Sequence, residues 1–246
     1  MAVAFMANTQ HLYYREDVLK ELGIPVPKTY EEVVAASEKI RASGKMQHPY
    51  AAAYKAGWNL AEEFVNMFIG HGGEFFKAGT AEPNINNAKG VATLNMLKKL
   101  ASLSNPDYLT HDSEAIKVEW ESGKVALMTL WASRSGTLLD DEGDAKITAA
   151  TKLTGPATVG GGNIPAATLW WDGFTLAKNR SDSDAEASFI ALAHAASNKK
   201  MVADAADQAV WLVEGFVPGP KSIGVIEAVK MGAKPYPMLP QMGLMH

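Results

Sequence analysis

The sequence predicts an α/β fold, in which helices cover the faces of a sheet. Short apolar runs alternate along the chain with longer segments whose apolar residues recur every three or four positions. This alternation is typical of strands that are each followed by a helix. With 246 residues, of which 47% are apolar and 20% charged, the chain is long enough to bury a substantial core.

The first predicted element is a strand that carries polar side chains at its far end. An apolar run over residues 2–7 gives way to two amides and a hydroxyl, Asn8, Thr9 and Gln10. Gly23 is expected to close the following helix as a left-handed cap. Thr29 and Glu32 have the spacing of a capping box, which predicts a second helix over residues 30–43.

The middle of the chain continues the alternation. A short strand over residues 50–54 precedes a helix that Asn59 is expected to cap. Its buried stripe consists of Phe64, Val65, Phe68 and Ile69. A further helix, opened by residues 84–87 and running to about residue 103, is expected to face four apolar side chains inward: Val91, Leu94, Leu97 and Leu100.

Two more strands and several helices complete the predicted order. Ser113 is expected to cap a helix that carries Trp120, and a strand follows over residues 124–133. Another strand is predicted over residues 168–177. Ser183 and Glu186 then have capping-box spacing, so a helix is expected to residue 197. Its inner face would consist of Ala187, Ile190, Leu192 and Ala195. Further helices are expected through residue 213 and over residues 222–231.

Composition excludes several classes of function. The formal net charge is −4 and no basic cluster is present, which argues against a nucleic-acid partner. The longest apolar run, residues 125–132, is shorter than the roughly 18 to 20 residues that span a bilayer, so a soluble chain is expected. The absence of cysteine rules out disulfides and thiolate metal sites.

No catalytic, metal or cofactor site is predicted. The six histidines form no HxxxH or HxH pair, and GxSxG, Walker and GxGxxG patterns are absent. Carboxylates are adjacent at Glu62 and Glu63, and Glu119 and Glu121 form a second close pair. Glycoside hydrolysis needs two carboxyl groups that face one bond. Neighbouring helical positions point away from each other, so separate roles are favoured over a catalytic pair.

Tryptophans lie at the ends of predicted elements, where clefts form. A sugar presents apolar C–H faces ringed by hydroxyls, and it is bound by aromatic rings with convergent amides and carboxylates. Trp170 and Trp171 are adjacent on a strand, so only one of them can face a cleft; packing roles for individual tryptophans remain the alternative. The candidate ligand-binding residues are Asn8, Gln10, Trp58, Asn59, Glu62, Trp131, Arg134, Trp171, Asp172 and Trp211.

Two motifs suggest a family. Residues 14–32 follow the pattern Y-R-x-D-x-x-x-x-x-G-[I/L]-x-x-P-x-T-[Y/W]-x-E, and residues 120–128 read W-x-x-G-K-V-A-L-M. In this order they resemble the bacterial extracellular solute-binding proteins of the sugar type. The resemblance implies a type II periplasmic binding protein-like fold. It also implies a substrate-binding component of an ABC importer, with a sugar as ligand and permease subunits as partners.

The resemblance also implies a domain organisation. Residues 1–12 would form a crossing strand and hinge, residues 13–165 the C-terminal lobe, and residues 166–246 a second crossing strand with helices that pack on an N-terminal lobe. Most of that lobe is expected to be missing from this chain. No signal peptide is evident, and the full-length protein is expected to be periplasmic.

One further expectation concerns assembly. Self-association is expected through the exposed face of the incomplete lobe. The alternatives to an importer component are a carbohydrate-active hydrolase, or a cytosolic ligand-sensing protein that uses the same fold.

Overall fold

The computed structural model describes residues 3–139, 143–197 and 228–235. One extended run supplies strands to two sheets, because β1 (Val3–Asn8) and β2 (Gln10–Arg15) are separated only by Thr9. β2 lies in a four-stranded sheet of order β3-β4-β2-β5, and β1 in a three-stranded sheet of order β1-β6-β7. The other strands are β3 (Tyr50–Ala52), β4 (Leu127–Trp131), β5 (Thr151–Thr154), β6 (Thr168–Phe174) and β7 (Lys234–Pro235).

Helices alternate with these strands, as the sequence predicts. The α-helices are α1 (Glu16–Glu21), α2 (Tyr30–Ala42), α3 (Trp58–Gly70), α4 (Ala88–Ala101), α5 (Ser113–Glu121), α6 (Ser135–Leu138), α7 (Ala145–Ala150) and α8 (Asp182–Ala195). Two short 3-10 helices are η1 (Tyr108–Thr110) and η2 (Ala132–Arg134). None of the helices in the described part of the chain is both long and apolar enough to cross a membrane.

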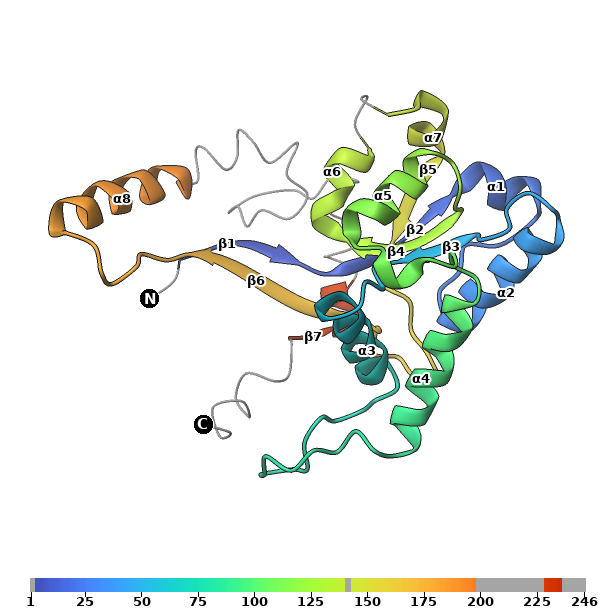
Figure 1. Ribbon diagram of the computed structural model, residues 1–246, viewed down its shortest axis with the longest axis horizontal. Helices are drawn as coiled ribbons and strands as arrows, with labels where there is room; N and C mark the ends of the chain where they lie inside the picture. The colour runs from blue at the N-terminus through green and yellow to red at the C-terminus, as the bar shows by residue number, and fades with distance from the viewer. Residues whose placement is uncertain (1–2, 140–142, 198–227, 236–246) are drawn as a thin grey trace.

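Helices and loops surround the four-stranded sheet, while the pair β1 and β6 projects away from this body towards α8 (Figure 1). β1 and β6 are antiparallel, and their register runs from Val3 opposite Phe174 to Asn8 opposite Trp170. The two segments that the sequence identifies as crossing strands are thus paired with each other; their role as crossings between two lobes stays a prediction.

The core has one cluster on each face of β2. Leu12 and Tyr13 are adjacent on this strand, so their side chains point to opposite faces. Leu12 belongs to a cluster with Ile40 of α2, and Tyr13 to a cluster with Trp120 of α5. The Trp120 indole is fully buried and donates a hydrogen bond from Nε1 to Thr151 Oγ1 at 2.9 Å. Burying each of these large side chains stabilises the fold by roughly 2 to 3 kcal/mol.

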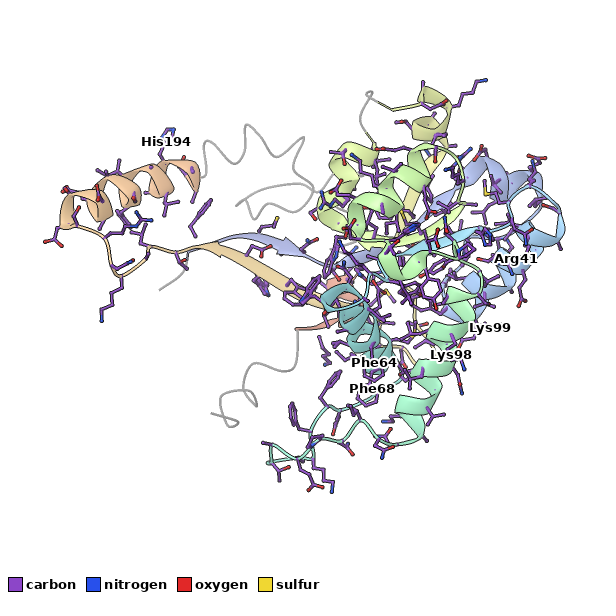
Figure 2. The ribbon with its side chains drawn as sticks, in the orientation of Figure 1. Arg41, Phe64, Phe68, Lys98, Lys99 and His194 are labelled. Atoms are coloured by element: carbon purple, nitrogen blue, oxygen red, sulfur yellow. The ribbon has the colours of Figure 1, made fainter. Side chains whose placement is uncertain are left out.

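Side chains also join the ends of elements. Arg41, near the end of α2, donates from Nε to the Gln47 carbonyl and from a terminal nitrogen to the Ser102 carbonyl, both at 2.7 Å. Figure 2 shows Arg41 on the same side of the molecule as α4. Phe64 and Phe68 stack along α3 with ring centroids 5.7 Å apart.

The capping box at the start of α2 is confirmed. Thr29 accepts a hydrogen bond from the Glu32 amide, and the Glu32 carboxylate accepts one from the Thr29 amide. Gly23 follows α1 with φ 58°, the left-handed conformation predicted for it.

Three other predicted caps are wrong. The residue before α3 is Gly57, so Asn59 lies inside the first turn. α5 is capped by Asp112, whose side chain accepts from the Ala115 amide, and α8 by Ser181. The polar residues chosen as caps fall one or two positions too late. Asp112 and Ser181 already have the extended backbone that a cap requires, and Gly57 precedes α3 at φ 106° without a side-chain cap.

Two predicted inner faces are also corrected. On α4, Leu97 and Leu100 are buried, but Val91 and Leu94 are 58% and 52% exposed, because the first half of the helix faces Gly90 and Thr93 inward instead. On α8 no residue is buried, and Ile190 is 61% exposed. Periodicity identifies an apolar stripe but not whether another element covers it. The helix predicted through residue 213 lies outside the described residues. Of the helix predicted over residues 222–231, residues 228–230 are described and helical.

Candidate functional site

Three tryptophans from three elements form one aromatic cluster. Trp58 begins α3, Trp131 ends β4 and Trp170 lies in β6. The rings of Trp58 and Trp131 are stacked, with centroids 6.2 Å apart and planes at 22°. The ring of Trp170 meets both edge to face, at 5.9 Å from Trp58 and 6.1 Å from Trp131. These spacings are those of interacting aromatic pairs.

Local backbone geometry places each ring. Gly57 has φ 106° and ψ −134°, a conformation that only glycine adopts readily, and it lets α3 begin abruptly with Trp58. After Trp131, the Ala132 amide bonds to the Thr9 carbonyl at 2.8 Å, which anchors the end of β4 to the junction between β1 and β2. Trp58 is 58% exposed, so the cluster presents an open aromatic surface.

The strand register decides between the two adjacent tryptophans of β6. Trp170 lies opposite Asn8 and Trp171 opposite Ala7, so the two indoles are on opposite faces of the ribbon. Trp171 is 60% exposed. Trp171, a predicted site residue, is therefore not part of the cluster, whereas Trp170 is.

A buried polar network lies directly behind Trp170. The indole Nε1 donates to Thr168 Oγ1 at 2.8 Å and also lies 3.3 Å from Glu62 Oε1. The Thr168 hydroxyl is 2.8 Å from Glu62 Oε1 and 2.9 Å from Asn66 Oδ1, and it can donate its single hydrogen to either. Glu62 and Asn66 are four residues apart on α3 and share a face of the helix.

The network continues to the first crossing strand. Gln10 Nε2 donates to Glu63 Oε1 at 2.7 Å, and Gln10 Oε1 accepts from Asn66 Nδ2 at 3.1 Å. Gln10 and Trp131 are paired in the register of β2 and β4. Hydrogen bonds therefore run without a break from β2 through α3 to β6.

Both carboxyls of the network are buried, Glu62 with 2% and Glu63 with 3% of its surface exposed. Burial raises the pKa of Glu63 to about 8; the hydrogen bond from Gln10 opposes this rise, and the nearby Glu62 adds to it. Burial also raises the pKa of Glu62, against the hydrogen bonds from Thr168, Trp170 and Asn66. Glu62, which receives more hydrogen bonds, is the better site for a negative charge, and Glu63 retains its proton at neutral pH.

The other predicted site residues lie around this centre. Asn8 bonds to Ser133 through its side-chain nitrogen at 3.1 Å and its oxygen at 3.2 Å. Arg134 forms an ion pair of 2.5 Å with Glu114 of α5. Asn59 is half-buried in the first turn of α3. Asp172 is exposed and, two positions from Trp170, lies on the same face of β6.

Trp211 lies outside the described residues. Sequence reasoning missed three members of the site, Glu63, Asn66 and Thr168, and left open whether Trp170 or Trp171 belongs to it. One signal could have found two of them. Acidic and amide side chains at positions 62, 63 and 66 interrupt the apolar stripe of α3, and polar groups in such a stripe need buried partners. Within the described residues there is no group of three or more histidine, aspartate or glutamate side chains placed to hold a metal ion.

Comparison with known proteins places this fold among binding proteins. The family model described as "Bacterial extracellular solute-binding protein" matches residues 2–209. A probable ABC transporter-binding protein of Deinococcus radiodurans is 28% identical over 187 residues, which are 73% of this chain and 43% of the relative. The chain thus spans less than half the length of that relative.

Solved structures agree in fold. The structure of maltose-bound T. maritima MalE3 has a TM-score of 0.76 at 21% identity, and the match covers 99% of this chain and 59% of that protein's chain. The structure of a chitin oligosaccharide binding protein has a TM-score of 0.78 at 17% identity, and the match covers 96% of this chain and 61% of that protein's chain. The expected periplasmic binding protein-like fold is confirmed. Because the family model matches most of its residues, the chain belongs to the bacterial extracellular solute-binding protein family.

Proposed function

We propose that this chain belongs to the substrate-binding component of an ABC importer, which captures a sugar or small oligosaccharide and delivers it to the permease subunits. The observation that carries the proposal is the cluster of Trp58, Trp131 and Trp170, which three separate elements bring together on an open surface. Membership of the solute-binding family and the sugar-binding proteins named among the similar structures support it.

The chemistry of the cluster suits a sugar. Indole faces stack on the apolar C–H faces of a pyranose ring, and neighbouring polar groups bond its hydroxyls. At the rim of the cluster, Arg134 and Asp172 would supply charged hydrogen-bonding groups and Asn59 an amide. Three other predicted residues would support the cluster without touching the sugar, because their hydrogen bonds hold the surrounding elements in place: Asn8, Gln10 and Glu62.

Binding without catalysis is the role that the carboxyl pair favours. Glu62 bonds to Thr168 of β6 and Glu63 to Gln10 of β2, and both are buried behind the indoles. A hydrolase needs two carboxyl groups on either side of one glycosidic bond. We therefore infer that the chain is not an enzyme.

The proposal extends to location and organisation. A solute-binding protein of this family acts outside the cytoplasmic membrane, and we place this one in the periplasm. β1 and β6 would act as the crossing strands between two lobes, with residues 13–165 forming the C-terminal lobe. Closure of the lobes around a ligand would create the form that the permease recognises.

Self-association through α8 is a further part of the proposal. Phe189 and Ile190 are 60% and 61% exposed on a helix that has no buried residue. Adjacent large apolar side chains at this exposure favour burial against a second surface. A second copy of the chain would supply that surface.

Calorimetric titration with a panel of mono- and disaccharides tests the binding role. Replacing Trp131 with alanine should weaken binding by about 1 to 3 kcal/mol, as truncated aromatic anchors commonly do. Trp171→Ala is the matched control, because Trp171 is on the opposite face of β6 and should leave affinity unchanged. An equal loss of affinity in the control would refute the proposed site.

A further inference from the structure

The gap between two indoles of the aromatic cluster is too narrow for a sugar ring. The rings of Trp58 and Trp131 are nearly parallel, with planes at 22° and centroids 6.2 Å apart. Carbon atoms in contact lie about 3.5 to 4.0 Å apart, so a ring held between two faces needs those faces roughly 7 to 8 Å apart. The Trp131 face that is turned towards Trp58 is therefore covered by the chain's own side chain.

Trp170 closes one side of this stack. Its ring meets Trp58 and Trp131 edge to face, with planes at 69° and 87° and centroids at 5.9 and 6.1 Å. Trp131 is thus the floor and Trp170 the wall of a slot, and the indole of Trp58 fills that slot. The proposed function requires a sugar ring on the face of Trp131, where the chain without ligand has Trp58.

The three indoles are held to different degrees. Trp131 lies in the paired strand β4, and its carbonyl accepts a hydrogen bond from the Tyr13 hydroxyl at 3.2 Å. The indole Nε1 of Trp170 donates to Thr168 Oγ1 at 2.8 Å. Within the described residues no hydrogen bond holds the indole of Trp58, which is 58% exposed. Trp58 is therefore the ring that leaves the stack at the lowest cost.

The start of α3 has room for the displaced indole. Gly57, the residue before Trp58, has no side chain, and no atom lies within 4 Å of the position that a Cβ would occupy there. More than half of the Trp58 surface already faces solvent. A change of side-chain rotamer therefore moves the ring outwards without moving the helix.

We propose that Trp58 is a displaceable occupant of the sugar-binding face of Trp131: without ligand it covers this face, and a sugar ring takes its place. This inference rests on the proposed function, because it concerns the same site. A ligand that needs the uncovered face binds only those molecules in which Trp58 has moved away, so its apparent affinity is reduced by their fraction. An aromatic pair holds this fraction to roughly one molecule in three to one in ten.

Calorimetric titration of Trp58→Ala with a sugar that binds the wild-type chain tests the competition. The variant exposes the Trp131 face in every molecule, so its affinity should be about three- to tenfold higher than that of wild type. Trp171→Ala, on the other face of β6, is the matched control and should bind as wild type does. Lower or unchanged affinity in Trp58→Ala overturns the inference, because Trp58 would then be a platform for the sugar or lie outside the site.

Fluorine nuclear magnetic resonance of the chain labelled with fluorotryptophan follows the displacement directly. The Trp58 resonance is identified by its loss in Trp58→Phe. Without ligand, it should shift when Trp131→Ala removes the stacking partner, and saturating sugar should shift it in the same direction in the wild-type chain. Because the second shift is read in the wild type, it does not depend on the stability of Trp58→Ala. The absence of either shift, with the sugar bound in the second case, overturns the inference.

The same variants separate this inference from the proposed function. A sugar that binds Trp58→Ala but not wild type supports both, because uncovering the Trp131 face then suffices for binding. A sugar that binds wild type while Trp58 stays on Trp131 refutes the exchange alone. If no sugar binds either chain, the proposed function fails and the exchange fails with it, whereas the stack that is measured without ligand stands.

Discussion

The buried carboxyl of Glu63 should make the stability of the protein fall as the pH rises. Its pKa is about 8 in the folded protein and 4.5 in an ordinary setting, so between these values the folded state holds a proton that the unfolded chain has released. Each pH unit in this window lowers the free energy of unfolding by about 1.4 kcal/mol. The stabilisation is full below about pH 4.5 and is lost as the pH approaches 8. From about pH 5 to about pH 8 the total loss is roughly 3 to 4 kcal/mol.

Replacing Glu63 with glutamine removes this proton while keeping the shape of the side chain and an oxygen that can accept from Gln10. Glu63→Gln and wild type should therefore have similar stability near pH 5, and the variant should be more stable by roughly 3 kcal/mol near pH 8. Urea denaturation followed by far-ultraviolet circular dichroism at fixed pH measures both curves, with Glu119→Gln as the matched control. Parallel curves for wild type and Glu63→Gln would refute the reasoning, because the slope would then come from other groups.

Three further predictions concern other parts of the chain. Burial lowers the pKa of His11 to about 3, and neither ring nitrogen has a hydrogen-bond partner among the described residues. As the pH falls, His11 of the unfolded chain therefore binds a proton while the folded state leaves it neutral, and the free energy of unfolding should fall by roughly 3 kcal/mol between about pH 7 and about pH 4. His11→Phe should reduce this loss in urea denaturation. The same loss in the variant as in wild type would contradict the prediction. Gly57→Ala should destabilise the fold by about 1 to 3 kcal/mol through backbone strain alone, since no atom lies within 4 Å of the added Cβ. Gly79→Ala, at a milder φ of 72°, should cost less, and equal losses in the two variants would be inconsistent with strain at φ 106°. Light scattering at rising concentration should show association that the double variant Phe189→Glu, Ile190→Glu removes, and a monodisperse wild-type monomer would argue against the α8 surface.

The sequence predicts those parts of the fold that local chemistry determines. The capping box of Thr29 and Glu32 needs only the residues that form it, so its place was predictable to the residue. The position of Trp58 and Trp131 at the ends of elements was likewise visible in the local pattern. Cap positions elsewhere differ by one or two residues, because Asp112 and Ser181 adopt the extended conformation before the predicted caps and Gly57 opens α3 in a conformation that favours glycine.

Features that depend on the partner of an element could not be predicted. The alternation of side chains along a strand places Trp170 and Trp171 on opposite faces of β6. Only the contact with α3 determines that Trp170 is on the face that joins the aromatic cluster. Adjacent helical positions such as Glu62 and Glu63 are both buried only when the helix is enclosed on two sides, and no local pattern reports this. The same reason explains α8, whose apolar stripe is real but uncovered.

The single residue between β1 and β2 has a mechanical consequence. Thr9 is fully buried, and its carbonyl accepts a hydrogen bond from the Ala132 amide. The backbone of Thr9 is therefore a fixed point about which β1 and β2 can rotate relative to each other. β1 has 6 residues and is therefore about 20 Å long. A rotation of roughly ten degrees in the backbone of Thr9 would move the far end of β1, and β6 with it, by about 3 to 4 Å. Gln10 lies next to Thr9, so the same rotation moves its contacts with Trp131 and Glu63 by only a fraction of an ångström.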